Sequence, residues 1–218
     1  MLLIELKVSY SRNSVNANEL TRELTRVATA ARTEVWGKTL PFGTDSLRIL
    51  PEAYWEEIHV ALAGYEHEFQ MLLGTGGAFI SHSLLPYPTV GMEDTASLAL
   101  QARLREDLQE REDLAEDALR LRMTNALAHV ADRMRVEYGG GAAIPRRFHD
   151  TLFSNLSSEN VLCRAFNDGL FQNTGLHAVF EGVDTIAGYD PKAVRKDAAL
   201  RRRVCDLCQD LINMLSNA

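Results

Sequence analysis

After Leu3, the first ten residues of the chain alternate between apolar and polar side chains. From Ile4 to Val8 every second side chain is apolar, and polar residues lie between them. A period of two is typical of a strand with one buried face. We therefore predict a strand over residues 1–10. The two short apolar pieces of residues 38–50, on either side of a Gly-Thr-Asp turn, predict a hairpin that can pair with this strand.

Helical spacing follows on both sides of the hairpin. Apolar residues three and four positions apart predict a helix over about 16–34, capped by Asn16 or Asn18, and a second helix over 51–73. Residues 74–94 contain glycines, two prolines and several apolar side chains. Because loops of this length are uncommon without a role, we expect a long ordered loop or a flap that packs on something.

The longest periodic stretch covers residues 95–138 and predicts a single helix. At 1.5 Å per residue, about 40 residues give a rod of roughly 60 Å, longer than a compact domain of this size needs. Such a helix is expected to project, to pair with another helix or to kink. Twelve of the twenty residues from Arg103 to Arg122 are charged, which usually indicates a solvated, salt-bridged face. Its predicted apolar seam consists of Leu100, Leu104, Leu108, Leu114, Ala118, Leu121, Ala128, Ala131 and Met134.

The three glycines at 139–141 end this helix and are the expected boundary between two parts of the chain. Further helical patterns begin at Pro145, at Ser157-Ser158 and at Asp190-Pro191. The fold class is therefore α+β, mainly α: an N-terminal strand and hairpin, one long charged helix and a C-terminal helical cluster. We expect one domain over 1–138, including the long helix, and a helical subdomain over 142–218.

Composition agrees with a globular protein. The chain has 218 residues, of which 46% are hydrophobic and 24% charged, and a formal net charge of -7. Three cysteines are too few for a disulfide scaffold, and an acidic residue at position 5 precedes any long apolar stretch. No window approaches the roughly 18 to 20 apolar residues that span a bilayer. We expect a reduced protein in the cytoplasm of a host cell, without membrane contact.

The negative charge is concentrated in one segment. Between Arg48 and Arg103 there is no Lys or Arg, and the seven acidic residues of that window equal the whole net charge. This pattern indicates either a solvated acidic helix face or a docking face for a basic partner or a second subunit. The candidate partner-binding residues are Glu52, Glu56, Glu57, Glu66 and Glu68.

Basic residues gather near the C-terminal helices. Phosphate contacts would follow from such a patch, but it lacks the interleaved aromatic residues of single-strand binders. Helix flanks rich in Lys and Arg are also commonly just solvated, or paired with acidic residues elsewhere in the chain. The candidate nucleic-acid-binding residues are Arg146, Arg147, Lys192, Arg195, Lys196, Arg201, Arg202 and Arg203.

The motifs that usually carry catalysis or metal binding are not supported. The glycines at 74–77 follow a helix and lack the lysine of a phosphate-binding loop. Cys205 and Cys208 have the spacing of a zinc or redox pair but lie within a helical pattern, which favours structural cysteines. Glu56 and His59 have a di-iron spacing without the second such pair that this centre requires. We predict no enzyme activity, cofactor or metal.

Five segments follow one another in a recognisable order: Thr39–Gly43, Ser46–Pro51, Tyr54–Leu73, Arg146–Leu152 and Asp190–Arg201. In this order they resemble an uncharacterised family of bacteriophage and integrative-element proteins. Members of that family share a hairpin-like TLP segment, a helix, a long charged helix, an R-F-x-D-S/T-L segment and a C-terminal helix after "DPALR". The chain departs from the family at the loop of 74–94. The resemblance implies a mobile-element setting, often near recombination or ATPase genes, and it transfers no catalytic residues.

Three functional hypotheses follow. The first is a non-enzymatic phage or mobile-element protein that acts through protein–protein contacts and self-associates along its long helix. The second is a DNA-associated accessory protein of recombination or replication that uses the basic C-terminal patch. The third is an inhibitor of a host defence complex, comparable to an anti-CRISPR protein, that uses the acidic 49–102 segment to mimic DNA.

Overall fold

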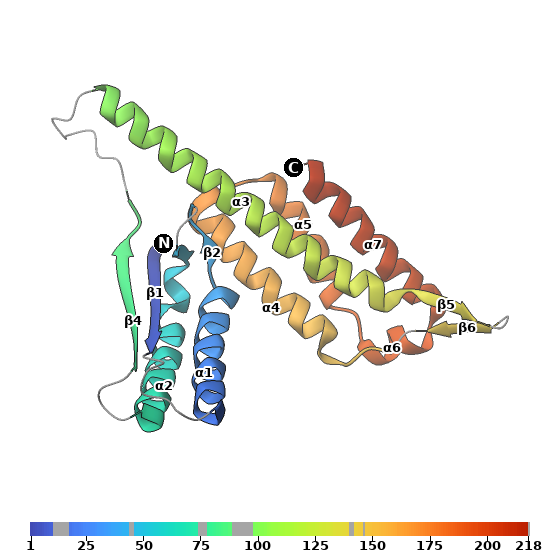
Figure 1. Cartoon of the computed structure of the whole chain (residues 1–218). Coiled ribbons are helices and arrows are strands. Elements are labelled where there is room, and N and C mark those ends of the chain that lie inside the picture. Colours follow the sequence, from blue (N-terminus) through green and yellow to red (C-terminus); the bar gives the residue numbers. More distant parts are fainter. Residues whose placement is uncertain are drawn as a thin grey trace. The chain divides into compact units, whose positions relative to one another are not determined.

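The computed structural model of the protein divides into two compact units, Met1–Ala115 and Glu116–Ala218 (Figure 1). The α+β, mainly α fold class is confirmed. The division falls within α3 (Leu98–Met134), whereas the sequence places the expected boundary at the glycines 139–141. The structure describes residues 1–10, 18–43, 46–73, 78–88, 98–139, 142–145 and 147–217.

The first unit contains an antiparallel sheet of strand order β2-β3-β1-β4. The predicted strand is β1 (Leu2–Tyr10), and the predicted hairpin is β2 (Leu40–Pro41) with β3 (Leu47–Leu50), which pairs with β1 as expected. The fourth strand, β4 (Ala78–Pro86), lies in the stretch expected to be a loop or flap. The apolar doublets 79–80 and 84–85 interrupt the strict alternation, which explains why the sequence pattern did not indicate a strand there.

Two helices pack on the sheet and bury its apolar residues. They are α1 (Asn18–Gly37) and α2 (Trp55–Leu73), the latter preceded by the 3₁₀ turn η2 (Glu52–Tyr54) after Pro51. Both predicted helices are confirmed, with α1 extending three residues beyond its expected end. The shared core combines one face of the sheet with the predicted apolar stripes of the helices, and it includes Ile4, Leu24, Val27, Ala31, Leu50, Ile58, Leu62, Phe69 and Ile80.

The N-terminal part of α3 belongs to the first unit and is held at the β2–β3 turn. The guanidinium of Arg111 donates a hydrogen bond to the carbonyl of Phe42 at 3.3 Å and lies 5.6 Å from its ring centroid. Tyr87, which follows β4, donates a hydrogen bond to Glu112 and packs its ring against Phe42. Burial and this carboxylate raise the pKa of the Tyr87 hydroxyl. These contacts anchor α3 to the sheet of its own unit.

The second unit is helical apart from one hairpin. After α3 come β5 (Val136–Gly139) and β6 (Ala142–Pro145), and then α4 (Thr151–Phe166) with the π-helical turn η3 (Asn167–Phe171). The chain ends with α5 (Gly175–Ala187), α6 (Pro191–Lys196) and α7 (Ala198–Asn217). Among the described residues, no helix of either unit is long and apolar enough to cross a membrane.

Three details of α3 and the second unit correct the sequence predictions. The helix expected to begin at Pro145 begins at Thr151, because Pro145 is the last residue of β6. The helix expected to start at Ser157-Ser158 is part of a longer α4, in which the hydroxyl of Ser158 bonds to the carbonyl of Ser154 within the helix. The predicted apolar seam of α3 is confirmed at Ala131 and Met134 but wrong at Leu104, Leu114 and Leu121, which are exposed. This helix carries leucines on two sides, and tertiary contacts bury one of them. Its buried residues are Ala115, Leu119, Met123, Leu127, Val130, Ala131 and Met134.

Candidate interaction surfaces

Arg201, predicted to bind nucleic acid, is instead a buried structural residue. Only 3% of it is exposed, and its guanidinium donates hydrogen bonds to the carbonyls of Arg133, at 2.7 Å, and Met134, at 3.4 Å. These carbonyls lie at the C-terminal end of α3, where helix carbonyls lack partners within the helix. Burial lowers the pKa of Arg201. Arg201 therefore caps α3 and is not available to an external ligand.

The sequence contains a signal for this role. Arg201 continues the buried stripe of α7, which recurs at spacings of three and four residues. A basic residue on an apolar stripe is expected to have internal partners, because an unpaired buried charge is costly. The buried residues of α7 are Arg201, Val204, Cys208, Leu211 and Leu215.

Arg195 is also engaged within the second unit. It forms an ion pair with Asp150, at the start of α4, and its guanidinium lies 5.0 Å from the ring centroid of Phe148. The same ring contacts the guanidinium of Arg201 at 5.6 Å. One aromatic side chain thus lies against two of the predicted DNA contacts, and both have structural partners.

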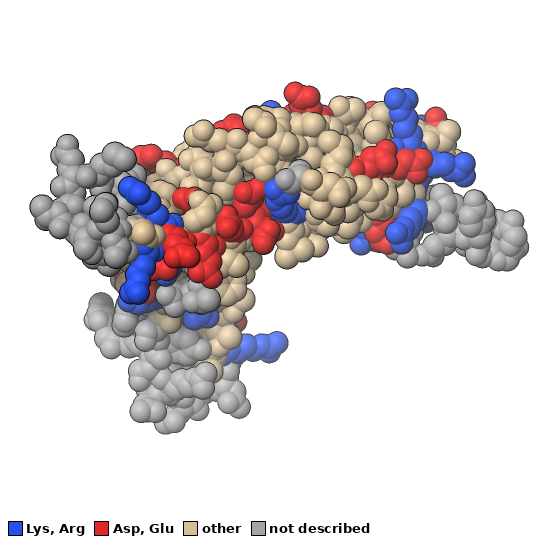
Figure 2. All heavy atoms as spheres, turned by 90° about the horizontal axis from the view of Figure 1, so that it is seen from above, with Lys and Arg blue, Asp and Glu red and all other residues tan. Residues whose placement is uncertain are grey.

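The other predicted basic residues that the structure describes are exposed. Figure 2 shows Lys and Arg side chains, with acidic ones between them, at the end of the second unit where α3 ends and α6 and α7 begin. Asp190 and Asp197 use their carboxylates to cap α6 and α7. Arg146 lies outside the described residues. The exposed members are Arg147, Lys192, Lys196, Arg202 and Arg203.

The acidic candidates on α2 are only partly available. Glu57 pairs with Lys38 at 2.5 Å, and Glu68 pairs with Arg26 of α1. Burial acts to lower the pKa of Lys38, but the hydrogen bonds that its ammonium donates to Glu57 and Glu34 outweigh it and leave the pKa raised.

The remaining members of the acidic set are spread along the same segment. Glu52 and Glu56 are exposed, and Glu66 is half-buried beside His82. Arg26 of α1 and Lys38, which follows α1, therefore neutralise part of the segment that contains only acidic charges in the sequence.

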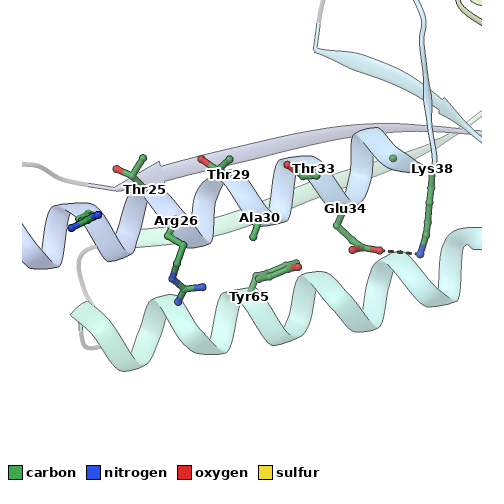
Figure 3. Close-up of a pocket in the computed structure, with 10 residues that line it drawn as sticks. Thr25, Arg26, Thr29, Ala30, Thr33, Glu34, Lys38 and Tyr65 are labelled. Carbon is green, nitrogen blue, oxygen red and sulfur yellow. Dashed lines mark hydrogen bonds and ion pairs between the residues drawn. The ribbon is translucent and has the colours of Figure 1, made fainter. Parts of the chain in front are cut away.

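An open groove of about 750 Å³ runs between α1 and α2. Thr25, Thr29 and Thr33 line it from α1, and Figure 3 shows Tyr65 of α2 beside Ala30 of α1. The ion pair between Glu34 and Lys38 lies at one end. Two other lining residues, Arg26 and Lys38, form ion pairs with Glu68 and Glu57 of α2, so the residues of the groove help to hold the two helices together.

His59 of the Glu56–His59 motif has aromatic rings as its neighbours. The His59 ring packs against Trp55, with centroids 5.2 Å apart, and against His82 of β4, with centroids 5.6 Å apart. Burial and the neighbouring His59 lower the pKa of His82, while Glu66 acts in the opposite direction. In the described part of the chain, no group of three or more metal-ligating side chains comes together.

The cysteines have the environment of structural residues. Cys208 is buried, and burial raises its pKa to about 12. Cys205 is half-buried, its pKa is raised chiefly by burial, and its thiol approaches the carbonyl of Ala131 at 3.7 Å. A raised pKa disfavours the thiolate that metal binding and redox exchange require.

The exposed face of α3 carries apolar residues that the sequence had assigned to the buried seam. Leu104, Leu114 and Leu121 are 47%, 44% and 61% exposed. Leu114, Ala118 and Leu121 have the i, i+4, i+7 spacing that places them on one side of the helix.

No family model, curated protein or solved structure matches the chain.

Proposed function

We propose that this chain is a non-enzymatic protein that acts through protein–protein contacts and self-associates along α3. The supporting observation is the exposure of Leu104, Leu114 and Leu121 on a helix that is otherwise strongly charged. Leu114 and Leu121 form one row along the helix, because they are seven residues apart. Fully burying one leucine stabilises an interface by about 1.5–3 kcal/mol. A partner helix with the same pattern would bury these leucines and pair with the flanking charges of both signs.

The proposal fits the mobile-element setting that the family resemblance implies. In that setting the partners are further copies of the chain and a phage or host protein. Both kinds of contact can use the same surface, because an exposed apolar row within a charged helix suits any amphipathic helix of matching charge.

The test is the variant L104Q/L114Q/L121Q, which removes the apolar row without changing net charge. We expect its self-association to weaken at least about tenfold, measured as the dimer dissociation constant by sedimentation velocity. The matched control V60Q/M71Q/V161Q alters three other exposed apolar residues, which are 62%, 75% and 57% exposed. An unchanged dissociation constant in the α3 variant, or an equal loss in the control, would contradict the proposal.

A second candidate function is DNA association through the basic residues at the α6–α7 end. Its support is the exposure of Arg147, Lys192, Lys196, Arg202 and Arg203. We expect R202A/R203A to weaken binding of labelled duplex DNA and to reduce the salt slope by about two, because two phosphate contacts are lost.

Fluorescence anisotropy across a salt series measures both quantities for single- and double-stranded DNA. The matched control is R22A/R32A, which removes two exposed arginines from α1 in the first unit. The DNA hypothesis fails if wild-type binding is independent of salt, or if the α7 variant binds as tightly as the control. The third hypothesis, inhibition of a host defence complex, has less support because Glu57 and Glu68 are paired within the protein.

A further inference from the structure

The outer strand of the sheet, β4, is long, and within it there is no bulge and no charged side chain to protect the edge. At the opposite edge β2 has two residues, but β4 has nine, all in register with β1 and without a bulge. Natural proteins block long edges with charged residues, prolines, bulges or covering segments. The sequence of β4, AFISHSLLP, contains no charged residue and has its proline at the last position. Among the described residues, no strand pairs with its outer side.

The sequence of β4 is also nearly symmetric about its centre. His82 is the middle residue, with a serine on each side of it, and Ile80 and Leu84 lie one position further out. In an antiparallel pair, residues on facing strands that lie directly opposite each other stabilise the sheet when their chemistry matches. A strand with this symmetry matches a second copy of itself.

We propose that β4 pairs antiparallel with β4 of a second copy of this chain, around a twofold axis at His82. Ile80 of one copy then lies opposite Leu84 of the other, Ser81 opposite Ser83, and His82 opposite His82. The contact is isologous, as in most homodimers, and it continues the sheet through eight strands, four from each copy. Each free edge provides the backbone partners of the other.

The surroundings of β4 agree with this register. Ile80 and Leu84 belong to the core that the sheet shares with α2, so their pairing extends an apolar layer from one copy to the next. Ser81 and Ser83 are exposed on the other face.

The central histidine is suited to face its own copy. His82 packs against Trp55 and His59, and Glu66 is the acidic group beside it. Its lowered pKa keeps the ring neutral at neutral pH, so two His82 rings can face each other without charge repulsion.

This contact rests on the proposed self-association and gives it a second surface. In both proposals the partner is another copy of this chain. The two surfaces use different residues, β4 in one case and α3 in the other. Variants of each surface therefore distinguish failure of one proposal from failure of the other.

The test is a pair of charge variants, S81K/S83K and S81E/S83E. In the proposed register each variant places like charges opposite each other twice, so each alone should lose the β4 contact. Mixed together, they place Lys opposite Glu twice and should associate. Ser81 lies opposite Lys7 of β1, and Ser83 opposite Glu5, so each variant gains one favourable and one unfavourable neighbour within its own sheet.

Sedimentation velocity should show at least a tenfold weaker association of each variant alone, and recovery in the equimolar mixture. The matched control S154K/S158K adds the same charge at exposed serines of α4 and should behave as the wild type. As an independent readout, H82C should form an intermolecular disulfide under mild oxidation, whereas H67C, on the exposed side of α2, should not.

Three results overturn the β4 contact: wild-type association in S81K/S83K, no recovery in the mixture, or no crosslink in H82C. If these occur while the α3 variant still weakens association, the β4 contact is wrong and the proposed function stands. If the β4 variants behave as expected while the α3 variant associates normally, the β4 contact stands and the α3 surface is wrong.

Discussion

Replacing Arg201 by alanine is expected to lower the free energy of unfolding by about 2–4 kcal/mol. The guanidinium donates to the carbonyls of Arg133 and Met134 and lies against Phe148, all within the second unit. Its loss leaves two carbonyls at the end of α3 without these donors in a region that excludes water, and it opens a cavity beside the aromatic ring. Urea unfolding followed by circular dichroism measures the change.

The neighbouring exposed arginines provide the control for this prediction. R202A and R203A should each change the free energy of unfolding by less than about 0.5 kcal/mol, as expected for surface substitutions that remove no buried hydrogen bond and no core contact. A stable R201A variant that had lost DNA binding would show that Arg201 contacts a ligand, and would contradict its role as a cap of α3.

Replacing Gly182 by alanine is expected to destabilise the protein by about 1–2 kcal/mol, although alanine is the better helix former. Gly182 lies in α5, where it packs against α7. A methyl group there would be 2.5 Å from Cδ2 and 3.0 Å from Cδ1 of Leu211. Because Leu211 is itself 6% exposed, its side chain has little room to move aside. The two helices must therefore separate or Leu211 must adopt a strained rotamer.

Gly64 is the matched control, since it also lies within a helix, α2, but has no atom within 4 Å of the added methyl group. G64A should stabilise the protein by about 0.5–1 kcal/mol through helix propensity alone. Opposite signs for the two variants in thermal unfolding would support the close α5–α7 contact. A stabilising G182A would contradict it.

Local periodicity was sufficient to predict the elements whose buried side is unambiguous. β1, α1 and α2 each have one apolar face, and Leu24, Val27, Ile58 and Phe69 are all fully buried as their spacing indicates. β4 was missed because its apolar doublets obscure the alternation. The predicted seam of α3 is wrong at Leu114, because this helix has apolar residues on two sides. Leu114 lies on the exposed side and Leu119 on the buried side. Which side is buried depends on tertiary contacts that no local pattern contains.

The candidate surfaces are predicted from clusters of like charge along the sequence. The sequence does not show which charged residues form ion pairs with one another in the folded chain. Arg195 pairs with Asp150, and Arg26 with Glu68, across more than forty residues of chain in both cases. These pairings follow from the packing of helices, so a count of charges overestimates the surface that is free to bind a ligand.

The central claim is that copies of this chain bind one another. Sedimentation equilibrium of the wild-type protein over a wide concentration range, at neutral pH, tests it most directly. We expect a mass that rises with concentration from the chain mass of 24.3 kDa to twice that value or more. A mass of 24.3 kDa at every concentration would contradict both the α3 surface and the β4 contact.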